Sequence, residues 1–289
     1  MPHDTFPHAD LDLGSLCLGD RDRVVAGLAD AFPVLASQPQ RQHARELSFR
    51  GGRAAAIAEV SRIDPDAYAR TRNHVSGRVT RLSPWIRHGV LALSEVRDAA
   101  LARVARPEQA EKLISELGWR DYWRQVQFAI GDRVNEDLER PASSSRTGLH
   151  HDRMPEDVIE ARTGLACIDD FVRRLQGTGW LHNHERMWLA SWLVHVRGVS
   201  WRTGADWMLG HLLDGDPASN HLSWQWVAGT FSAKPYLFNR DNLESFTDGI
   251  HCHPCTLRGI CDVEGSYEEL SARHLTAGPP AARPSLRIP

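Results

Sequence analysis

Helical periodicity runs through most of the chain after residue 51, and it limits the fold more than any other feature. Helical patterns occur at 52–63, 94–104, 108–130, 155–176, 181–196 and 203–213. No segment alternates apolar and polar residues as a half-buried strand does, and no strand–helix–strand spacing occurs. The sequence therefore predicts an almost entirely α-helical fold.

The composition excludes several classes of protein. A chain of 289 residues with 42% hydrophobic residues is long enough to bury a full core. Its formal net charge of −3 means that any contact with DNA must come from a local basic patch. No stretch approaches the ~20 consecutive apolar residues that cross a bilayer, and the first residues lack the pattern of a secretion signal. We therefore expect a cytoplasmic protein.

Composition along the chain predicts four parts. Residues 1–48, rich in Asp, His and Pro, are expected to form an arm or a peripheral helix, and 49–247 a helical domain. Residues 248–276 hold a group of cysteines, and 277–289 contain four prolines, which predicts a loose tail. Within the domain, the polar, Ser-rich interval 135–155 has no periodicity and is expected to be a loop.

Tryptophan is concentrated in one part of the chain. Seven of the ten tryptophans lie between Trp180 and Trp226, which predicts either a large aromatic core or a site for stacking and electron transfer. In the same region Asp214 and Asp216 flank a glycine directly after a predicted helix. An isolated Asp-Gly-Asp is most often only a turn. Beside Asn220 and the Trp224-Gln225-Trp226 string, it is expected to form one wall of a cofactor pocket.

Five short motifs follow one another in a fixed order. They are Tyr68 with Arg72-Asn73, Thr80-Arg81-Leu82-Ser83-Pro84, Glu116-Leu117-Gly118-Trp119-Arg120, Thr178-Gly179-Trp180-Leu181-His182-Asn183 with Arg186-Met187, and Trp201-Arg202 with Asp214-Gly215-Asp216, Asn220 and Trp224-Gln225-Trp226. Each string is weak alone, but in this order they resemble the FAD-binding domain of the photolyase/cryptochrome family. The resemblance runs from about residue 49 to 247. The residues before it are too few for the N-terminal α/β antenna domain of that family, so no antenna pigment is expected.

The resemblance implies FAD as cofactor and a set of residues that bind it. These are Tyr68, Thr80, Arg81, Leu82, Ser83, Trp119, Arg120, Asn183, Arg186, Asp214, Asp216 and Asn220. Asn220 matches the position that faces flavin N5, and Trp224 and Trp201 match the first two members of the family's electron-transfer chain. The third usually comes from the segment matching 133–160, which contains no tryptophan here. Val196 stands where the family has an Asp that pairs with the flavin-edge arginine, so Asp214 is the expected partner of Arg186.

The implied reaction is light-driven repair of DNA, in which reduced FAD splits cyclobutane pyrimidine dimers. The residues that match lesion contacts are Glu116, Trp119, Asn183, Met187 and Trp226, and Glu116, Asn220, Trp224 and Trp201 match the catalytic set. Two alternatives stay open. One is a blue-light receptor of the cryptochrome type. The other, suggested by His184, Val196 and the missing antenna domain, is a flavoprotein with chemistry unrelated to DNA.

Four cysteines form a candidate ligand set for iron. Cys252, Cys255 and Cys261 lie within ten residues, and Cys167 precedes the Thr-Gly-Trp motif. This layout resembles the iron–sulfur branch of the same family, which implies a [4Fe–4S] cluster held by four thiolates. Zinc, with His251 or His253 as an additional ligand, is the alternative.

Overall fold

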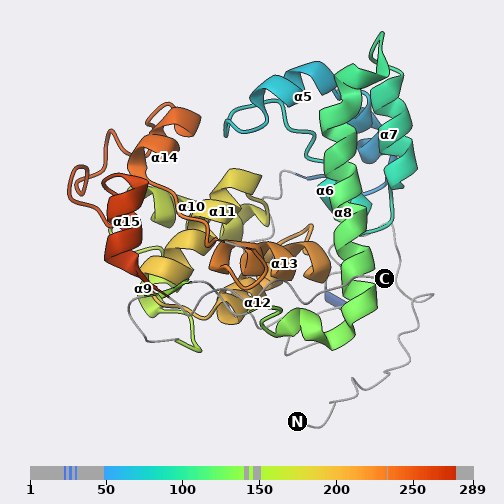
Figure 1. Ribbon diagram of the computed structural model, residues 1–289. Coiled ribbons are helices and arrows are strands. Elements are labelled where there is room, and N and C mark those ends of the chain that lie inside the picture. The colour runs from blue at the N-terminus through green and yellow to red at the C-terminus, as the bar shows by residue number, and fades with distance from the viewer. Residues whose placement is uncertain are drawn as a thin grey trace. The chain divides into compact units, whose positions relative to one another are not determined.

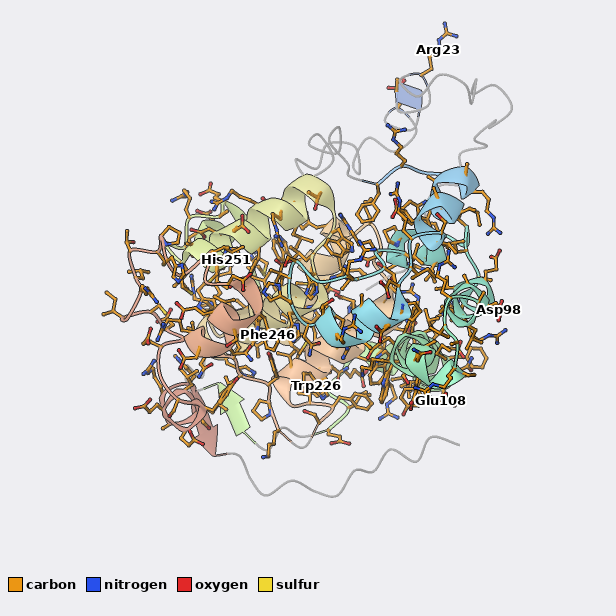
Figure 2. The ribbon with its side chains drawn as sticks, turned by 90° about the horizontal axis from the view of Figure 1, so that it is seen from above. Arg23, Asp98, Glu108, Trp226, Phe246 and His251 are labelled. Atoms are coloured by element: carbon orange, nitrogen blue, oxygen red, sulfur yellow. The ribbon has the colours of Figure 1, made fainter. Side chains whose placement is uncertain are left out.

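The chain divides into two compact units, Met1–Leu47 and Ser48–Pro289. The computed structural model describes residues 49–139, 143–145, 151–232 and 234–277, together with 23, 26, 27 and 30. In the first unit these four residues are helical, and one of them, Arg23, is labelled in Figure 2. The rest of the predicted arm 1–48 and the predicted tail from residue 278 on lie outside the described residues.

The second unit is built from helices, as the periodicity predicts (Figure 1). In chain order they are α4 (Arg53–Val60), α5 (Pro65–Thr71), α6 (Ser83–Arg87), α7 (Leu93–Leu101), η2 (Pro107–Ala110), α8 (Glu111–Ile130), η3 (Gly131–Asn135), α9 (Glu156–Ile159), α10 (Ala166–Thr178), α11 (Asn183–Ser191), the π-helical turn η4 (Trp192–Val196), α12 (Trp201–His211), α13 (Pro217–Ala228), α14 (Arg240–Thr247) and α15 (Tyr267–His274). Among the described helices, none is both long and apolar enough to cross a bilayer.

The prediction of an almost entirely α-helical fold is confirmed, and two short strands are the only β-strands among the described residues. β1 (Ser143–Ser145) pairs antiparallel with β2 (Leu275–Ala277), with Ser144 opposite Thr276. The partners are more than a hundred residues apart in sequence, and a run of serines carries no alternating pattern. Periodicity within one segment therefore could not reveal this pairing.

Local signals explain where several helices begin and end. Asp64 caps α5 by accepting a hydrogen bond from the Ala67 amide at 2.9 Å, and Pro65 fills the first helical position. Gly179, with a φ of +67°, ends α10 in the left-handed region that glycine adopts without strain. The helix predicted at 155–176 is instead divided into α9 and α10, because Ala161 and Gly164 both take positive φ.

Three hydrophobic cores among the described residues hold these helices, and the smallest joins α8 to α13 through Val126 and Leu222. The first contains buried residues of α4, α6, α7 and the start of α8, such as Val60, Trp85 and Leu113. The second joins α10 to α14 around Trp188, Trp192 and Phe171. Viewed from above, Trp226 of α13 lies between the helices that carry Asp98 and Glu108 and the part of the chain that carries Phe246 and His251 (Figure 2). The functional site lies where α8 and α13 meet.

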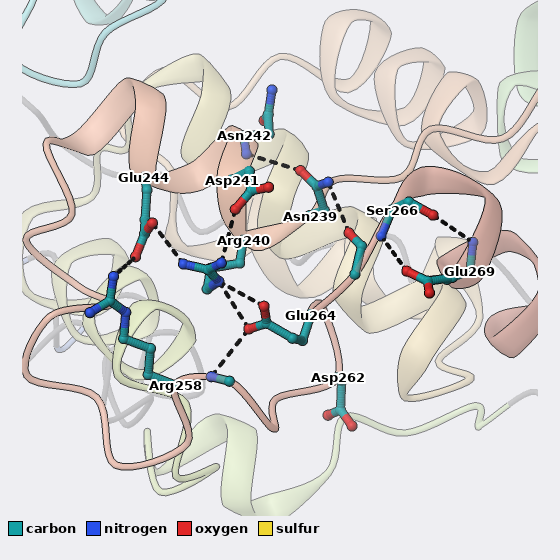
Figure 3. Close-up of polar contacts among 12 residues, drawn as sticks. Asn239, Arg240, Asp241, Asn242, Glu244, Arg258, Asp262, Glu264, Ser266 and Glu269 are labelled. Carbon is teal, nitrogen blue, oxygen red and sulfur yellow. Dashed lines mark hydrogen bonds and ion pairs between the residues drawn. The ribbon is translucent and has the colours of Figure 1, made fainter.

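A network of ion pairs holds the cysteine-containing segment after α14 in place (Figure 3). Arg240 contacts Glu244 at 2.8 Å and Glu264 at 2.9 Å, and Arg258 contacts Glu244 at 3.1 Å. The Glu264 carboxylate also accepts a hydrogen bond from the Gly259 amide at 3.2 Å. One arginine thus connects the first turn of α14 to the chain that leads into α15.

Candidate functional site

Two adjoining cavities, of about 460 and 270 Å³, lie among α5, α6, α8, α11, α12 and α13. Both are lined by the same five residues, Glu116, Arg120, Asn183, Arg186 and Asp214. The two cavities are therefore parts of one elongated site. Most of the predicted cofactor and substrate residues line one or both of them.

Asn220 and Trp224 form part of the wall of the larger cavity on α13. The Asn220 amide nitrogen donates to the Ala205 carbonyl at 2.9 Å, so its orientation is fixed by α12. Trp224 packs against Gly204, where a β carbon would lie 2.4 Å from the indole ring. The close approach of α12 and α13 thus depends on a glycine at the point where the indole crosses.

Arg186 and Asp214 form the ion pair that the sequence predicts. Nη2 of Arg186 contacts the two carboxylate oxygens at 2.8 and 3.0 Å, and Nε donates to the Leu181 carbonyl at 3.0 Å. Asp214 is buried, so the arginine compensates a charge that would otherwise be costly to bury. Val196 lies in the π-helical turn and packs against the second core.

Arg120 carries the clearest sign of a missing ligand. Its guanidinium lies 3.6 Å from Asp216, yet its buried Nε has no hydrogen-bond partner among the described residues. Burial lowers the pKa of Arg120. A buried donor left without an acceptor costs about 1–3 kcal/mol, and an anionic or carbonyl oxygen in either cavity would satisfy it.

Two exposed indoles border the larger cavity from different helices. Trp119 of α8 is 51% exposed and Trp226 of α13 is 39% exposed. Large exposed aromatic side chains next to a cavity are typical of surfaces that stack on flat ligands. Trp226 also stacks on Tyr236, with ring centroids 5.4 Å apart, which supports it from the side.

Besides the indoles, the residues predicted to contact the substrate are Glu116, Asn183 and Met187, and all three line the larger cavity. Oε1 of Glu116 pairs with Arg72 at 2.9 Å and with Lys112 at 3.0 Å. The Asn183 amide donates to Sδ of Met187 at 3.4 Å, one turn further along α11. These pairs fix the side chains in place around the opening.

The smaller cavity is lined by Tyr68, Thr80, Arg81 and Ser83, as expected. Arg81 has a φ of +53°, and its guanidinium lies over the rings of Phe49 and Trp180 at 4.9 and 4.6 Å. Leu82 does not line either cavity, and its contact with FAD stays a prediction. It is 1% exposed and belongs to the first core, since the turn at Arg81 directs the next residue away from the cavity.

Several residues of the site were missed by the sequence analysis. Trp123, Ser219 and Ser223 line the larger cavity, and His184 lines the smaller one. Helical spacing could have indicated the first three, because Trp123 follows Trp119 by one turn and Ser223 lies one turn after Ser219. His182 also lines the smaller cavity, and burial lowers its pKa to about 4.

Trp201 lies behind the site rather than in it. It is 8% exposed, belongs to the second core and is absent from the lining of both cavities. His221 of α13 meets its ring edge-on at a centroid distance of 6.2 Å. Trp201 is thus positioned one layer behind Trp224.

Three of the four cysteines lie in or against the second core, but not as a ligand set. Cys167 and Cys252 are buried in that core and Cys261 packs against it. Burial raises the pKa of Cys167, and it raises that of Cys252 to about 11. In the part of the chain that the structure describes, no group of three or more His, Cys, Asp or Glu side chains is placed to hold a metal. The predicted set of Cys167, Cys252, Cys255 and Cys261 is therefore not assembled in ligating geometry.

Comparison with known proteins supports the location of the site. Residues 113–267 match the family described as the FAD binding domain of DNA photolyase. A deoxyribodipyrimidine photo-lyase of Streptomyces griseus is 38% identical over 52% of this chain and 32% of its own length. A cryptochrome DASH of Ostreococcus tauri is 32% identical over 67% of this chain and 37% of its own length. The chain thus spans about a third of the length of these curated relatives.

Solved structures give the same result for the fold. A bacterial class III photolyase from Agrobacterium tumefaciens superposes with a TM-score of 0.61 at 25% identity, over 74% of this chain and 46% of that one. A cryptochrome from Synechocystis superposes with the same TM-score at 26% identity, over 71% of this chain and 45% of that one. The family match covers more than half of the chain and includes α8, α11, α12 and α13, which supply the larger cavity. By fold, motif order and sequence, the chain belongs to the photolyase/cryptochrome family, of which it holds the FAD-binding domain.

Proposed function

We propose that this chain binds FAD and uses light to split cyclobutane pyrimidine dimers in DNA. The observation that carries the proposal is the larger cavity, where Trp119 and Trp226 border the opening and Asn220 and Trp224 form the wall. Such a cavity offers a polar wall for a flat cofactor and two exposed rings for a second flat ligand. A pyrimidine dimer extruded from DNA is a ligand of that kind.

The residues of the elongated site fit FAD. The unpartnered Nε of Arg120 would hold a phosphate or carbonyl oxygen of the cofactor, and Thr80 and Ser83, which line the smaller cavity, would add hydroxyl donors. When bound, the cofactor would supply an electron under light and take it back after the ring of the dimer opens. The protein's part is to hold that cofactor and the lesion next to each other and to exclude water.

The side-chain amide of Asn220 determines which kind of ligand group can hydrogen-bond to it. The Ala205 carbonyl holds one N–H of its amide and so fixes its orientation, and no described residue is bonded to the amide oxygen, which is left for a group in the cavity. That oxygen accepts a hydrogen bond and carries no charge, so it favours an N–H on the ligand. A protonated ring nitrogen of a reduced flavin would satisfy it.

For DNA, the indoles supply most of the affinity and the polar side chains supply orientation. Stacking a base on an aromatic ring contributes about 1–3 kcal/mol. Glu116 and Asn183 border the same cavity and are suited to the carbonyl and imide edges of the dimer. Arg124, exposed on α8 one turn beyond Arg120, is a candidate for phosphate contact, whereas Arg197 and Arg240 are already paired with carboxylates.

The test is repair in vitro. The chain is loaded with FAD, reduced and illuminated with a single-stranded oligonucleotide that contains one thymine dimer, and the return of thymine absorbance is followed. Trp119→Ala and Trp226→Ala should each weaken binding of that oligonucleotide roughly 5- to 150-fold. Phe128→Ala is the matched control, because Phe128 is 89% exposed on the same helix and lies outside both cavities. No repair by the loaded protein would refute the proposal.

A blue-light receptor is the second candidate, because relatives named cryptochrome DASH match the chain as extensively as those named photo-lyase. His184 and Val196 are the residues that suggest chemistry unrelated to DNA, and of the two only His184 lines a cavity. His184 stacks on Phe246 at 5.0 Å, and Val196 packs in the second core. A light-induced change of the flavin absorption without repair would favour the receptor.

An iron–sulfur cluster stays a prediction. The four cysteines do not fit a metal as they are arranged, so no step of the proposed function runs through one. The supporting observation is that Cys167 and Cys252 are buried in one core and that Cys261 packs against it. Iron, acid-labile sulfide and zinc are measured on protein purified without oxygen, and absence of all three would refute metal binding.

A further inference from the structure

The loop between α12 and α13 carries both buried aspartates of the elongated site. Asp214 pairs with Arg186 at 2.8 Å, and Asp216 lies 3.6 Å from Arg120. Both arginines line the two cavities, and both aspartates are buried. The position of this loop therefore determines where the two guanidinium groups of the site lie.

Two consecutive residues outside the cavities hold this loop. Arg87 is the last residue of α6 and His88 follows it, and both are exposed. Nε of Arg87 donates to the Gly215 carbonyl, and Nε2 of His88 donates to the Leu213 carbonyl at 2.9 Å. A carbonyl oxygen only accepts, so Nε2 of His88 carries a proton. The two bonds thus hold the carbonyls on either side of Asp214.

α6 is itself fixed in place, so it can support the loop. Trp85 packs in the first core, and its Nε1 donates to the Arg50 carbonyl at 3.1 Å. Ser83, the first residue of α6, lines the smaller cavity. One short helix thus connects the smaller cavity and the first core to the loop that carries Asp214.

Arg87 also adds a positive charge beside the site. Three arginines, Arg87, Arg120 and Arg186, contact the loop that carries the two buried aspartates, so one positive charge is in excess there. Burial is the main cause that lowers the pKa of Arg120, and the charge of Arg87 contributes in the same direction. Excess positive charge favours a ligand group that carries a negative charge over a neutral one.

We infer that Arg87 and His88 are positioning residues, which hold the carbonyls beside Asp214 so that its carboxylate meets Arg186. Arg87 has a second effect through its charge. Reduced FAD can lose a ring proton that oxidised FAD does not have, and it then carries one more negative charge. Arg87 therefore strengthens binding of reduced FAD more than binding of oxidised FAD. The inference rests on the proposed function, which supplies FAD as the ligand.

The first experiment measures the affinity of the full chain for oxidised FAD and, without oxygen, for reduced FAD at pH 8. His88→Phe removes the donor to the Leu213 carbonyl and should weaken both forms alike, about 2- to 10-fold, as one lost hydrogen bond does. His88→Gln keeps a donor and should restore most of the affinity.

Variants of Arg87 isolate the effect of charge. Arg87→Gln keeps a donor without the charge, so it should weaken reduced FAD about tenfold more than oxidised FAD. This ratio corresponds to a two-electron potential of the bound flavin that is about 30 mV lower. Arg87→Lys should keep the wild-type ratio. Arg103→Gln is the matched control, because Arg103 is exposed beyond α7 and lines neither cavity.

Amide hydrogen exchange tests the positioning without FAD. The amides of Leu213 and Gly215 donate to the Gly179 and Leu212 carbonyls at 2.9 and 3.3 Å, so their exchange reports how well the loop is held. Both should exchange faster in His88→Phe, and wild-type exchange would overturn the inference. Equal weakening of the two forms in Arg87→Gln would overturn the effect of its charge. A wild type that binds neither form would refute the proposed function, whereas the exchange of Leu213 and Gly215 would still test the positioning.

Discussion

At the scale of single residues, glycines control how closely the wall of the site packs. Gly204 and Gly210 both lie in α12, but only Gly204 faces Trp224. A β carbon at Gly204 would lie 2.4 Å from the ring, whereas at Gly210 it would meet nothing within 4 Å. Alanine substitutions at the two glycines therefore distinguish the effect of packing against Trp224 from the effect of helix propensity.

We predict that Gly204→Ala lowers the free energy of unfolding by about 1–3 kcal/mol, because the indole must shift to admit the methyl group. Gly210→Ala should instead raise it by about 0.4–1 kcal/mol, since alanine restricts the unfolded chain and fits the helix. Urea unfolding followed by circular dichroism measures both. Equal effects of the two substitutions would contradict the packing that we describe.

The residue scale also shows what the sequence could predict of the site. Asn220, Asp214 and Trp226 were predictable because each belongs to a short motif in a known order. The side chain of Leu82 belongs to the first core instead, and a motif does not show which way each of its side chains points. The bond between Arg87 and the Gly215 carbonyl joins residues 128 positions apart, and a single arginine at the end of a short helix carries no pattern that would indicate it.

At the scale of elements, the segment after α14 depends on ion pairs more than on helix packing. Arg240, 23% exposed, contacts three carboxylates, of Asp241, Glu244 and Glu264. Such a network is worth more than isolated surface pairs, because one side chain satisfies several charges at once. The turns that carry Cys252, Cys255 and Cys261 are held between Glu244 and Glu264.

We predict that Arg240→Ala destabilises this segment by about 1–3 kcal/mol. Amide hydrogen exchange should become faster in residues 249–265 and stay unchanged in α4 to α7. Arg70→Ala is the control, because Arg70 forms an exposed pair with Asp66 one turn earlier in α5 and should cost only about 0.3–0.5 kcal/mol. If amide hydrogen exchange became faster by the same factor across the whole second unit, Arg240 would not stabilise this segment in particular.

Helices with strong internal periodicity were predicted well at this scale. α8 lies within the predicted 108–130, and α12 overlaps the predicted 203–213. The pairing of β1 with β2 and the π-helical turn η4 were missed. Both depend on contacts with distant segments or on one extra residue per turn, which local periodicity does not record.

At the scale of the whole molecule, buried neutral histidines connect stability to pH. Burial lowers the pKa of His182, His195 and His211 to about 4 each. In the unfolded chain a histidine titrates near 6.5, so between these values the unfolded state binds more protons. Their contribution to stability is therefore complete above pH ~6.5 and is lost as the pH falls towards about 4.

His195 offers the sharpest test of this dependence. It is 2% exposed, and its Nε2 bonds to the Val227 carbonyl at 3.0 Å. The amide of His195→Gln keeps a donor for that carbonyl but does not titrate. The wild type should lose more stability than the variant between pH 7 and pH 5, by about 1–2 kcal/mol, as measured by urea unfolding at both values.

Glu185 acts in the opposite direction, because burial raises its pKa, but it is common to both proteins and cancels in the comparison. His151→Gln, at an exposed position, should keep the wild-type difference. An equal loss in His195→Gln and wild type would mean that this histidine is protonated in the folded protein as readily as in the unfolded chain.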